Sequence, residues 1–179
     1  MMRLFTAIAI PEEVRARLTE LVARLRPAAP VAWSPAGNWH ITTKFVGGCA
    51  DVAGLEEELA GVRAPAIEVA VRGFGWFPNP HQPRSLFAGV SGAGLAELHA
   101  QTDEACARRG VARERKPYTP HLTLARIRTG TPVGELRRVI GEMAETDWGR
   151  FRAGSFWLYE SRAEAEGSIY YRIKEFPLG

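Results

Sequence analysis

Two short segments, one in each half of the chain, share the pattern His, apolar residue, Thr, and then Thr or Leu. They are His40-Ile41-Thr42-Thr43 and His121-Leu122-Thr123-Leu124. Each lies in a run of β-branched and apolar residues, which predicts a β-strand whose side chains alternate between two faces. Histidine and threonine then share one face, and the apolar residues point into a core covered by helices. Each strand would present an imidazole and a hydroxyl side by side, about 7 Å apart along the chain.

If the two strands are neighbours, two imidazoles and two hydroxyls converge on one point. This arrangement suits the cleavage of a phosphodiester, because one proton must reach the leaving oxygen and another must leave the attacking water. Imidazole titrates near neutral pH and can do both, while threonine hydroxyls can hold the phosphoryl oxygens. A single histidine on a strand would indicate no function, but two matched copies favour a shared catalytic site.

The composition limits the other possibilities. With 179 residues, of which 46% are hydrophobic, the chain predicts a single domain over residues 1–179. No stretch is apolar for long enough to span a membrane, and the first residues lack a signal peptide, so we expect a cytoplasmic protein. The net charge of +3 is compatible with an anionic partner. Cys49 and Cys106 have no zinc-binding spacing and are expected to be free thiols.

Apolar periodicity predicts strands alternating with helices, and therefore an α+β fold with sheets inside and helices outside. The expected helices span residues 11–25, 51–62, 95–109 and 132–145, and Asp51 can cap the second. The expected strands include residues 3–10, 31–33, 40–46, 67–77, 85–90, 156–161 and 168–173, besides the strand of the second His-x-Thr segment. Residues 111–119 form a basic loop that is either a solvated turn or an RNA contact. His81 and His99 are given no role.

With their flanks, residues 38–47 and 120–126, the two segments resemble the motifs of the two-histidine (2H) phosphoesterase superfamily. Within it the sequence is similar to the RNA 2′,3′-cyclic phosphodiesterases, also called 2′-5′ RNA ligases. The similarity extends to residues 3–7, 11–13, 77–80 and 158–162. It implies two lobes related by a pseudo-twofold axis, whose antiparallel sheets line a central cleft with helices outside. It also implies an enzyme that needs no metal or cofactor.

The resemblance implies a role for each residue of the two motifs. His40 would be the proton donor to the departing 3′-oxygen, and His121 the proton acceptor that activates water, so that a 2′-phosphomonoester is formed. Thr42 and Thr123 would donate hydrogen bonds to the phosphate.

Four further residues are predicted to contact substrate, namely Arg126, Lys44, Tyr118 and Phe5. Lys44 has the strand parity of His40 and is expected to add positive charge to the same face. Simple alternation puts Arg126 on the face opposite His121, so its reach to the phosphate requires a bulge or a strand end. Thr43 puts a hydroxyl on the core face, where it needs a partner.

Several alternatives follow from the same residues. An ATP-dependent ligase is excluded, because none of Lys44, Lys116 and Lys174 lies in a Lys-x-Asp-Gly context and no P-loop is present. Reversible 2′-5′ ligation remains open, since the acid and the base would exchange roles. Hydrolysis of small cyclic nucleotides or of ADP-ribose cyclic phosphate also remains open, as does a non-catalytic RNA-binding module. The expected partner is an RNA end with a 2′,3′-cyclic phosphate, tRNA fragments included, and we expect a monomer without membrane contact.

Overall fold

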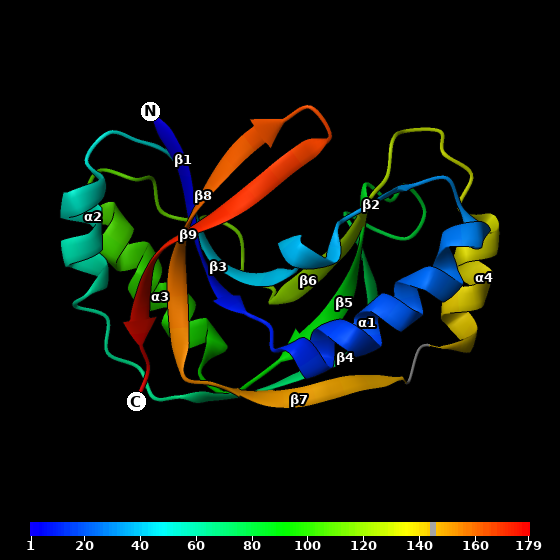
Figure 1. Cartoon of the computed structure of the whole chain (residues 1–179), viewed down its shortest axis with the longest axis horizontal. Coiled ribbons are helices and arrows are strands. Elements are labelled where there is room, and N and C mark those ends of the chain that lie inside the picture. The colour runs from blue at the N-terminus through cyan, green and yellow to red at the C-terminus, as the bar shows by residue number, and fades with distance from the viewer. Residues whose placement is uncertain (144–145) are drawn as a thin grey trace.

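In the computed structural model, which describes residues 1–143 and 146–179, nine strands form two antiparallel sheets (Figure 1). The strands are β1 (Met2–Ala9), β2 (Ala32–Trp33), β3 (His40–Cys49), β4 (Ile67–Phe77), β5 (Ser85–Ser91), β6 (His121–Arg126), β7 (Asp147–Ala153), β8 (Ser155–Glu164) and β9 (Gly167–Pro177). One sheet has the order β3-β1-β8-β9 and the other the order β2-β6-β5-β4-β7. Each sheet therefore contains one of the two His-x-Thr strands.

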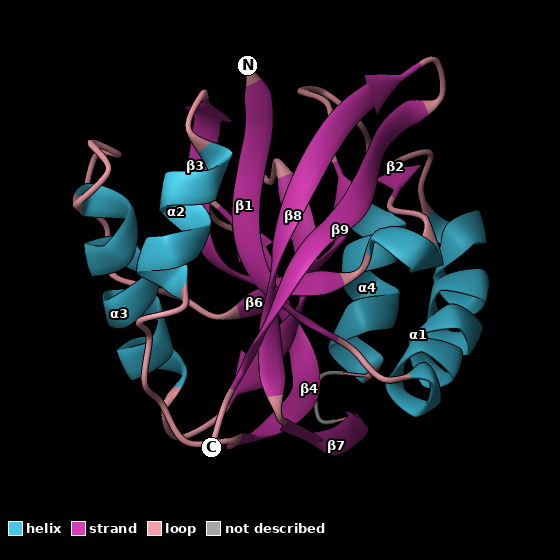
Figure 2. Ribbon diagram, turned by 60° about the vertical axis from the view of Figure 1, so that its left-hand side comes forward, coloured by secondary structure: helices cyan, strands magenta, loops and turns pink. Residues whose placement is uncertain are grey.

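Helices cover the outer side of both sheets, as the sequence predicts (Figure 2). They are α1 (Glu12–Leu25), α2 (Val52–Leu59), α3 (Leu95–Ala107) and α4 (Gly134–Glu142). Helix α1 follows a strand of the four-stranded sheet but packs against β7 of the five-stranded sheet, whereas α3 follows β5 and packs against β3. The chain must therefore cross between the two halves of the molecule before each His-x-Thr strand.

The apolar face of α1 shows how the sequence pattern produces this packing. Its residues Val14, Leu18, Leu21, Val22 and Leu25 are all buried. Burial of each such side chain contributes about 1.5–3 kcal/mol, so one helix face supplies a large part of the stability of its lobe. At the start of α2 the Asp51 carboxylate accepts a hydrogen bond of 2.9 Å from the Gly54 N–H, which confirms the predicted cap.

The structure adds one strand to the predicted elements and moves the bounds of others. Strand β7 was not predicted, because Gly149, with φ of 124°, interrupts its alternation at a register shift. The hairpin of β8 and β9 continues through most of residues 162–167, which were predicted as a turn. Helix α4 ends at Glu142, and the predicted end of this helix at Glu145 lies outside the described residues. None of the described helices is long and apolar enough to cross a membrane.

Candidate active site

Strands β3 and β6 lie at the centre of the molecule, where the two sheets meet (Figure 1). They belong to different sheets, yet their Cα atoms come within 8 Å of each other. On each strand the histidine and the threonine are half-buried, while the residue between them is fully buried. The predicted division of these residues between two faces is confirmed.

A β-bulge brings Arg126 to the face of His121. The pairing of β5 with β6 skips Leu124, so that Leu124 and Ala125 are both fully buried and Arg126 is exposed in the cleft. This is the bulge that strand alternation required if Arg126 was to reach the phosphate.

The same bulge recurs on β3 and overturns one expectation. The pairing of β1 with β3 skips Thr43, so both Thr43 and Lys44 point inward. The prediction that Lys44 shares the face of His40 is therefore wrong. The residue after the bulge, Phe45, takes the outward position instead and is 60% exposed. It lies five residues after His40, just as Arg126 lies five residues after His121 on β6. This repeated spacing is the sequence signal that would have identified Phe45 as a cleft residue.

The buried hydroxyl of Thr43 has the partner that it was expected to need. Its Oγ1 lies 2.6 Å from Oγ1 of Thr6 on the neighbouring strand. Lys44 is also buried, and its ammonium forms an ion pair of 2.6 Å with Asp103 of α3. Its predicted contact with substrate stays a prediction.

A backbone carbonyl fixes the imidazole of each catalytic candidate, His40 and His121, in the same way. Nδ1 of His40 lies 2.7 Å from the carbonyl oxygen of Asn38, and Nδ1 of His121 lies 2.7 Å from that of Thr119. A carbonyl can only accept a hydrogen bond, so Nδ1 carries the proton and Nε2 is left for chemistry. Nε2 of His40 is 2.9 Å from Oγ1 of Thr42.

Aromatic rings surround the two imidazoles. The ring of His40 lies 4.8 Å from that of Phe5 and meets Tyr170 edge-on at 5.1 Å, while His121 meets Phe77 edge-on at 4.9 Å. Such packing orients an imidazole and limits the water around it. Phe5 is only 3% exposed and supports His40 from the protein side, and its predicted contact with substrate stays a prediction.

Electrostatic effects link the two histidines to Arg126. Burial is the main cause that lowers the pKa of His40 to about 4, and the charges of His121 and Arg126 act in the same direction. Burial also lowers the pKa of His121, again with a contribution from the Arg126 charge. The charge of Arg126 therefore acts on both imidazoles, and both are neutral at pH 7 while no anion is bound.

A cleft of about 490 Å³ adjoins this site. Thr42, Phe45, His121 and Arg126 line it, together with Arg84 and with Lys116 of the basic loop. In the described part of the chain, no ion pair involves Arg84, Lys116 or Arg126.

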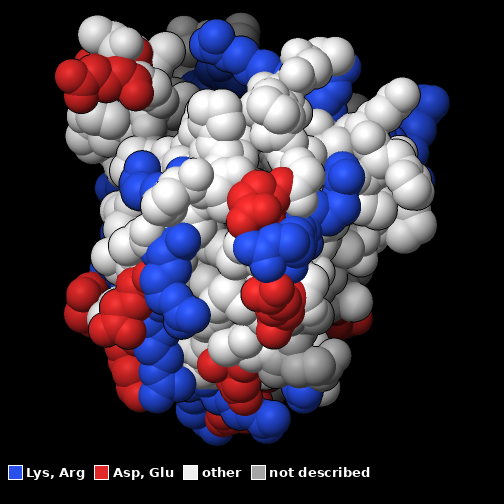
Figure 3. Space-filling model, turned by 90° about the vertical axis from the view of Figure 1, so that its right-hand side faces the viewer, with Lys and Arg blue, Asp and Glu red and all other residues white. Residues whose placement is uncertain are grey.

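The opposite situation holds on the outer face over α1 and α4, where acidic and basic side chains are intermixed (Figure 3). There Arg17 pairs with Glu13, and Arg138 pairs with Glu135. Arg84, Lys116 and Arg126 outnumber Glu114, the acidic residue among the described lining residues, so net positive charge gathers at the cleft and favours an anionic ligand there.

The remaining candidates are placed as follows. Tyr118 is half-buried, and its hydroxyl donates a hydrogen bond of 2.9 Å to the carbonyl oxygen of Thr42. Thr123 is half-buried on the face of His121. His81 lies exposed in a loop, whereas His99, which was given no role, lines the cleft. Among the described residues no three His, Cys, Asp or Glu side chains are grouped so that they could hold a metal ion.

Comparison with known proteins adds three findings. A family model described as LigT like phosphoesterase matches residues 8–87 and 90–170. The RNA 2′,3′-cyclic phosphodiesterase of Aeropyrum pernix is 32% identical over 89% of this chain and 92% of its own length, and that of Thermus thermophilus is 34% identical over 99% and 90%. The crystal structure of TT0787 of Thermus thermophilus superposes with a TM-score of 0.83 at 26% identity, covering 98% of this chain and 97% of that one.

Proposed function

Since the chain belongs to the family of LigT-like phosphoesterases, we propose that it hydrolyses the 2′,3′-cyclic phosphate at the end of an RNA to a 2′-phosphomonoester. The observation that supports this most is that the two His-x-Thr strands lie side by side, with Cα atoms within 8 Å of each other. Each imidazole presents Nε2 with Nδ1 fixed by a carbonyl, and the charge of Arg126 acts on both. One acid and one base beside a positive charge are what the opening of a cyclic phosphodiester needs.

The two histidines divide the proton transfers between them. Water attacks phosphorus while Nε2 of His121 takes its proton, the bond from phosphorus to the 3′-oxygen breaks, and Nε2 of His40 protonates that oxygen. The product has a 2′-phosphate and a 3′-hydroxyl, and solvent returns the proton from His121 to His40. If the 5′-hydroxyl of another RNA replaces water, the same steps give 2′-5′ ligation.

Substrate binding prepares His40 for its role as the acid. The negative charge of the phosphate raises the pKa of a nearby imidazole, so binding promotes protonation of His40. Once protonated, Nε2 no longer accepts a hydrogen bond from Oγ1 of Thr42, which lies 2.9 Å away, and its own proton is directed to the departing 3′-oxygen. The hydroxyl proton of Thr42 is thereby released to donate to a phosphoryl oxygen, as Thr123 does from the other strand.

The decisive experiment is product analysis with an oligonucleotide that ends in a 2′,3′-cyclic phosphate. We expect a 2′-phosphate end, and loss of turnover by about 10²–10⁴-fold in His40→Ala and in His121→Ala. His81→Ala is the matched control, because this histidine lies exposed in a loop. A 3′-phosphate product, or RNA binding without turnover, would refute the proposal.

The same assay separates the alternative substrates. Free cyclic nucleotides and ADP-ribose cyclic phosphate are tested beside the oligonucleotide, and we expect the RNA end to give the highest kcat/KM. The proposed enzyme acts as a monomer in the cytoplasm, on ends such as those of tRNA fragments. Both His-x-Thr motifs belong to one chain, which supports a site that needs no second copy.

A further inference from the structure

The ten residues before β6 make one of the crossings between the two halves of the molecule. Residues 111–120 contain no helix or strand, and they run from the end of α3, which packs on β3, to His121 in the other sheet. The carbonyl of Thr119, which fixes Nδ1 of His121, belongs to this crossing loop. The position of the imidazole therefore depends on how the crossing loop is held.

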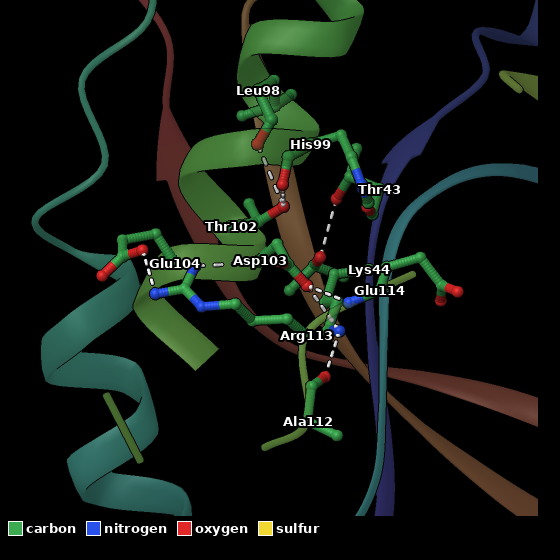
Figure 4. A network of polar contacts seen from close by, with 11 residues as sticks. Thr43, Lys44, Leu98, His99, Thr102, Asp103, Glu104, Ala112, Arg113 and Glu114 are labelled. Atoms are coloured by element: carbon green, nitrogen blue, oxygen red, sulfur yellow. Dashed lines mark hydrogen bonds and ion pairs between the residues drawn. The ribbon is translucent and has the colours of Figure 1, made fainter. Parts of the chain in front are cut away.

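A buried ion pair holds the start of the crossing loop. Lys44 of β3 and Asp103 of α3 lie 2.6 Å apart, and their side chains are only 3% and 12% exposed. Each also binds the loop backbone, since Nζ of Lys44 donates to the carbonyl of Ala112 at 2.8 Å, and Oδ1 of Asp103 accepts from the N–H of Glu114 at 3.0 Å (Figure 4). The two charged groups thus hold in place a segment that forms no helix or strand.

The state of Asp103 fits this role. Burial by itself raises the pKa of the carboxyl, but the hydrogen bonds from Lys44 and from the Glu114 N–H, with the charge of Lys44, hold it below the ordinary value. The carboxylate is therefore ionised at neutral pH and accepts both bonds. A buried ion pair contributes little net stability compared with apolar residues of the same shape, so its use here is better explained by the position that it imposes.

The other end of the crossing loop is also attached to β3. The hydroxyl of Tyr118 donates to the carbonyl of Thr42, and the Tyr118 ring stacks at 4.4 Å on His99. Nδ1 of His99 in turn donates to the carbonyl of Thr43 at 2.6 Å. Burial raises the pKa of Tyr118, which keeps the phenol protonated as a donor. The loop thus connects the strand of His40 directly to His121.

We propose that Lys44 and Asp103 are positioning residues, whose ion pair holds the crossing loop against β3 and so sets the place of His121 relative to His40. This inference rests on the proposed function. Neither side chain needs to touch the substrate for this role. The positioning role also explains why Lys44 points inward, since the bulge at Thr43 directs its side chain toward Asp103 and Ala112.

The test replaces both charges together by Lys44→Met and Asp103→Leu. Asp103→Leu alone would leave the buried charge of Lys44 without its ion pair, and Lys44→Met alone would leave Asp103 with Arg113 at 4.0 Å. We expect kcat to fall by about 10²-fold, the effect of a misplacement of about 1 Å, while KM changes little. Amide hydrogen exchange at Glu114 should become faster. The matched control is Arg108→Gln with Glu58→Gln, which removes an ion pair of the same 2.6 Å length between α2 and the residue that follows α3 and should leave kcat unchanged.

A second variant removes the other attachment. Tyr118→Phe keeps the ring on His99 and loses only the bond to Thr42, so it should also lower kcat with KM unchanged, even if the double variant fails to fold. Wild-type kcat in a folded double variant or in Tyr118→Phe, a change in KM alone, or unchanged exchange at Glu114 would overturn the inference. If the wild type hydrolyses no cyclic phosphate, the proposed function fails, and the exchange measurement still decides whether the pair holds the loop.

Discussion

The low pKa of His40 predicts that kcat/KM falls as the pH rises through neutrality. With a pKa of about 4, His40 is protonated in about one free enzyme molecule in 10³ at pH 7. The proposed mechanism requires His40 protonated and His121 neutral, and the pKa of both lies below the ordinary value of 6.5. Above pH 6.5, kcat/KM should therefore fall about tenfold per pH unit.

The assay measures kcat and kcat/KM separately between pH 4 and 8.5, at constant ionic strength. Because kcat/KM reports the free enzyme and kcat reports the substrate complex, the bound phosphate should place the falling limb of kcat at higher pH. Arg126→Gln removes a charge that lowers the pKa of both histidines, so it should move the falling limb of kcat/KM to higher pH. Arg126→Lys keeps the charge and is the control.

The pH dependence of the free energy of unfolding tests the low pKa of His40 without any turnover measurement. A histidine whose pKa is lowered on folding is neutral in the folded state at a pH where the unfolded chain already takes up a proton. The free energy of unfolding should therefore fall as the pH drops from 6.5 to about 4, by about 3 kcal/mol for His40. His40→Asn should lack this contribution in urea unfolding. An equal pH dependence in both proteins, or a flat kcat/KM above pH 6.5, would refute the reasoning.

Three further predictions concern the chemistry of the site. A substrate whose 3′-bridging oxygen is replaced by sulfur needs no proton to leave, so it should restore turnover in His40→Ala but not in His121→Ala, and rescue of His121→Ala alone would reverse the assigned roles. Turnover should persist in EDTA, and loss of activity that a divalent ion restores would contradict metal-independent catalysis. Phe45→Ala should raise KM for a cyclic nucleotide but not for an abasic ribose 2′,3′-cyclic phosphate, while Phe45→Trp should retain the wild-type KM. Equal effects on both substrates would exclude base stacking by Phe45.

The parts of the fold that follow from periodicity could be predicted from the sequence. The strands around His40 and His121, and the helices with a continuous apolar face, need only local patterns, because each buries one side. Strand β7 does not follow from such a pattern. Its Gly149 occupies a positive φ at a register shift, and a Cβ there would lie 3.3 Å from Val14 of α1. The alternation is lost at that point for a tertiary reason, which no local pattern contains.

The candidate site shows the same limit. Strict alternation was sufficient to place the threonines beside the histidines, but it misplaced Lys44, because one skipped residue in the pairing reverses the face of everything that follows. For Arg126 the sequence itself indicated a bulge, because simple alternation placed this residue on the face opposite His121 while a contact with the phosphate was expected. For Lys44 no such conflict existed, and only the equal spacing from His40 to Phe45 and from His121 to Arg126 pointed to a bulge at Thr43.

The two bulges give the two halves of the site different chemistry on the same backbone. After the bulge, β6 presents the cation of Arg126, whereas β3 presents the aromatic ring of Phe45. The inward residues differ as well, because β6 buries apolar side chains there and β3 buries Lys44, which needs Asp103. One half therefore offers a charge for a phosphate and the other a flat surface for a base. A cyclic nucleotide would meet these two surfaces in only one orientation, which is what the proposed roles of His40 as acid and His121 as base require.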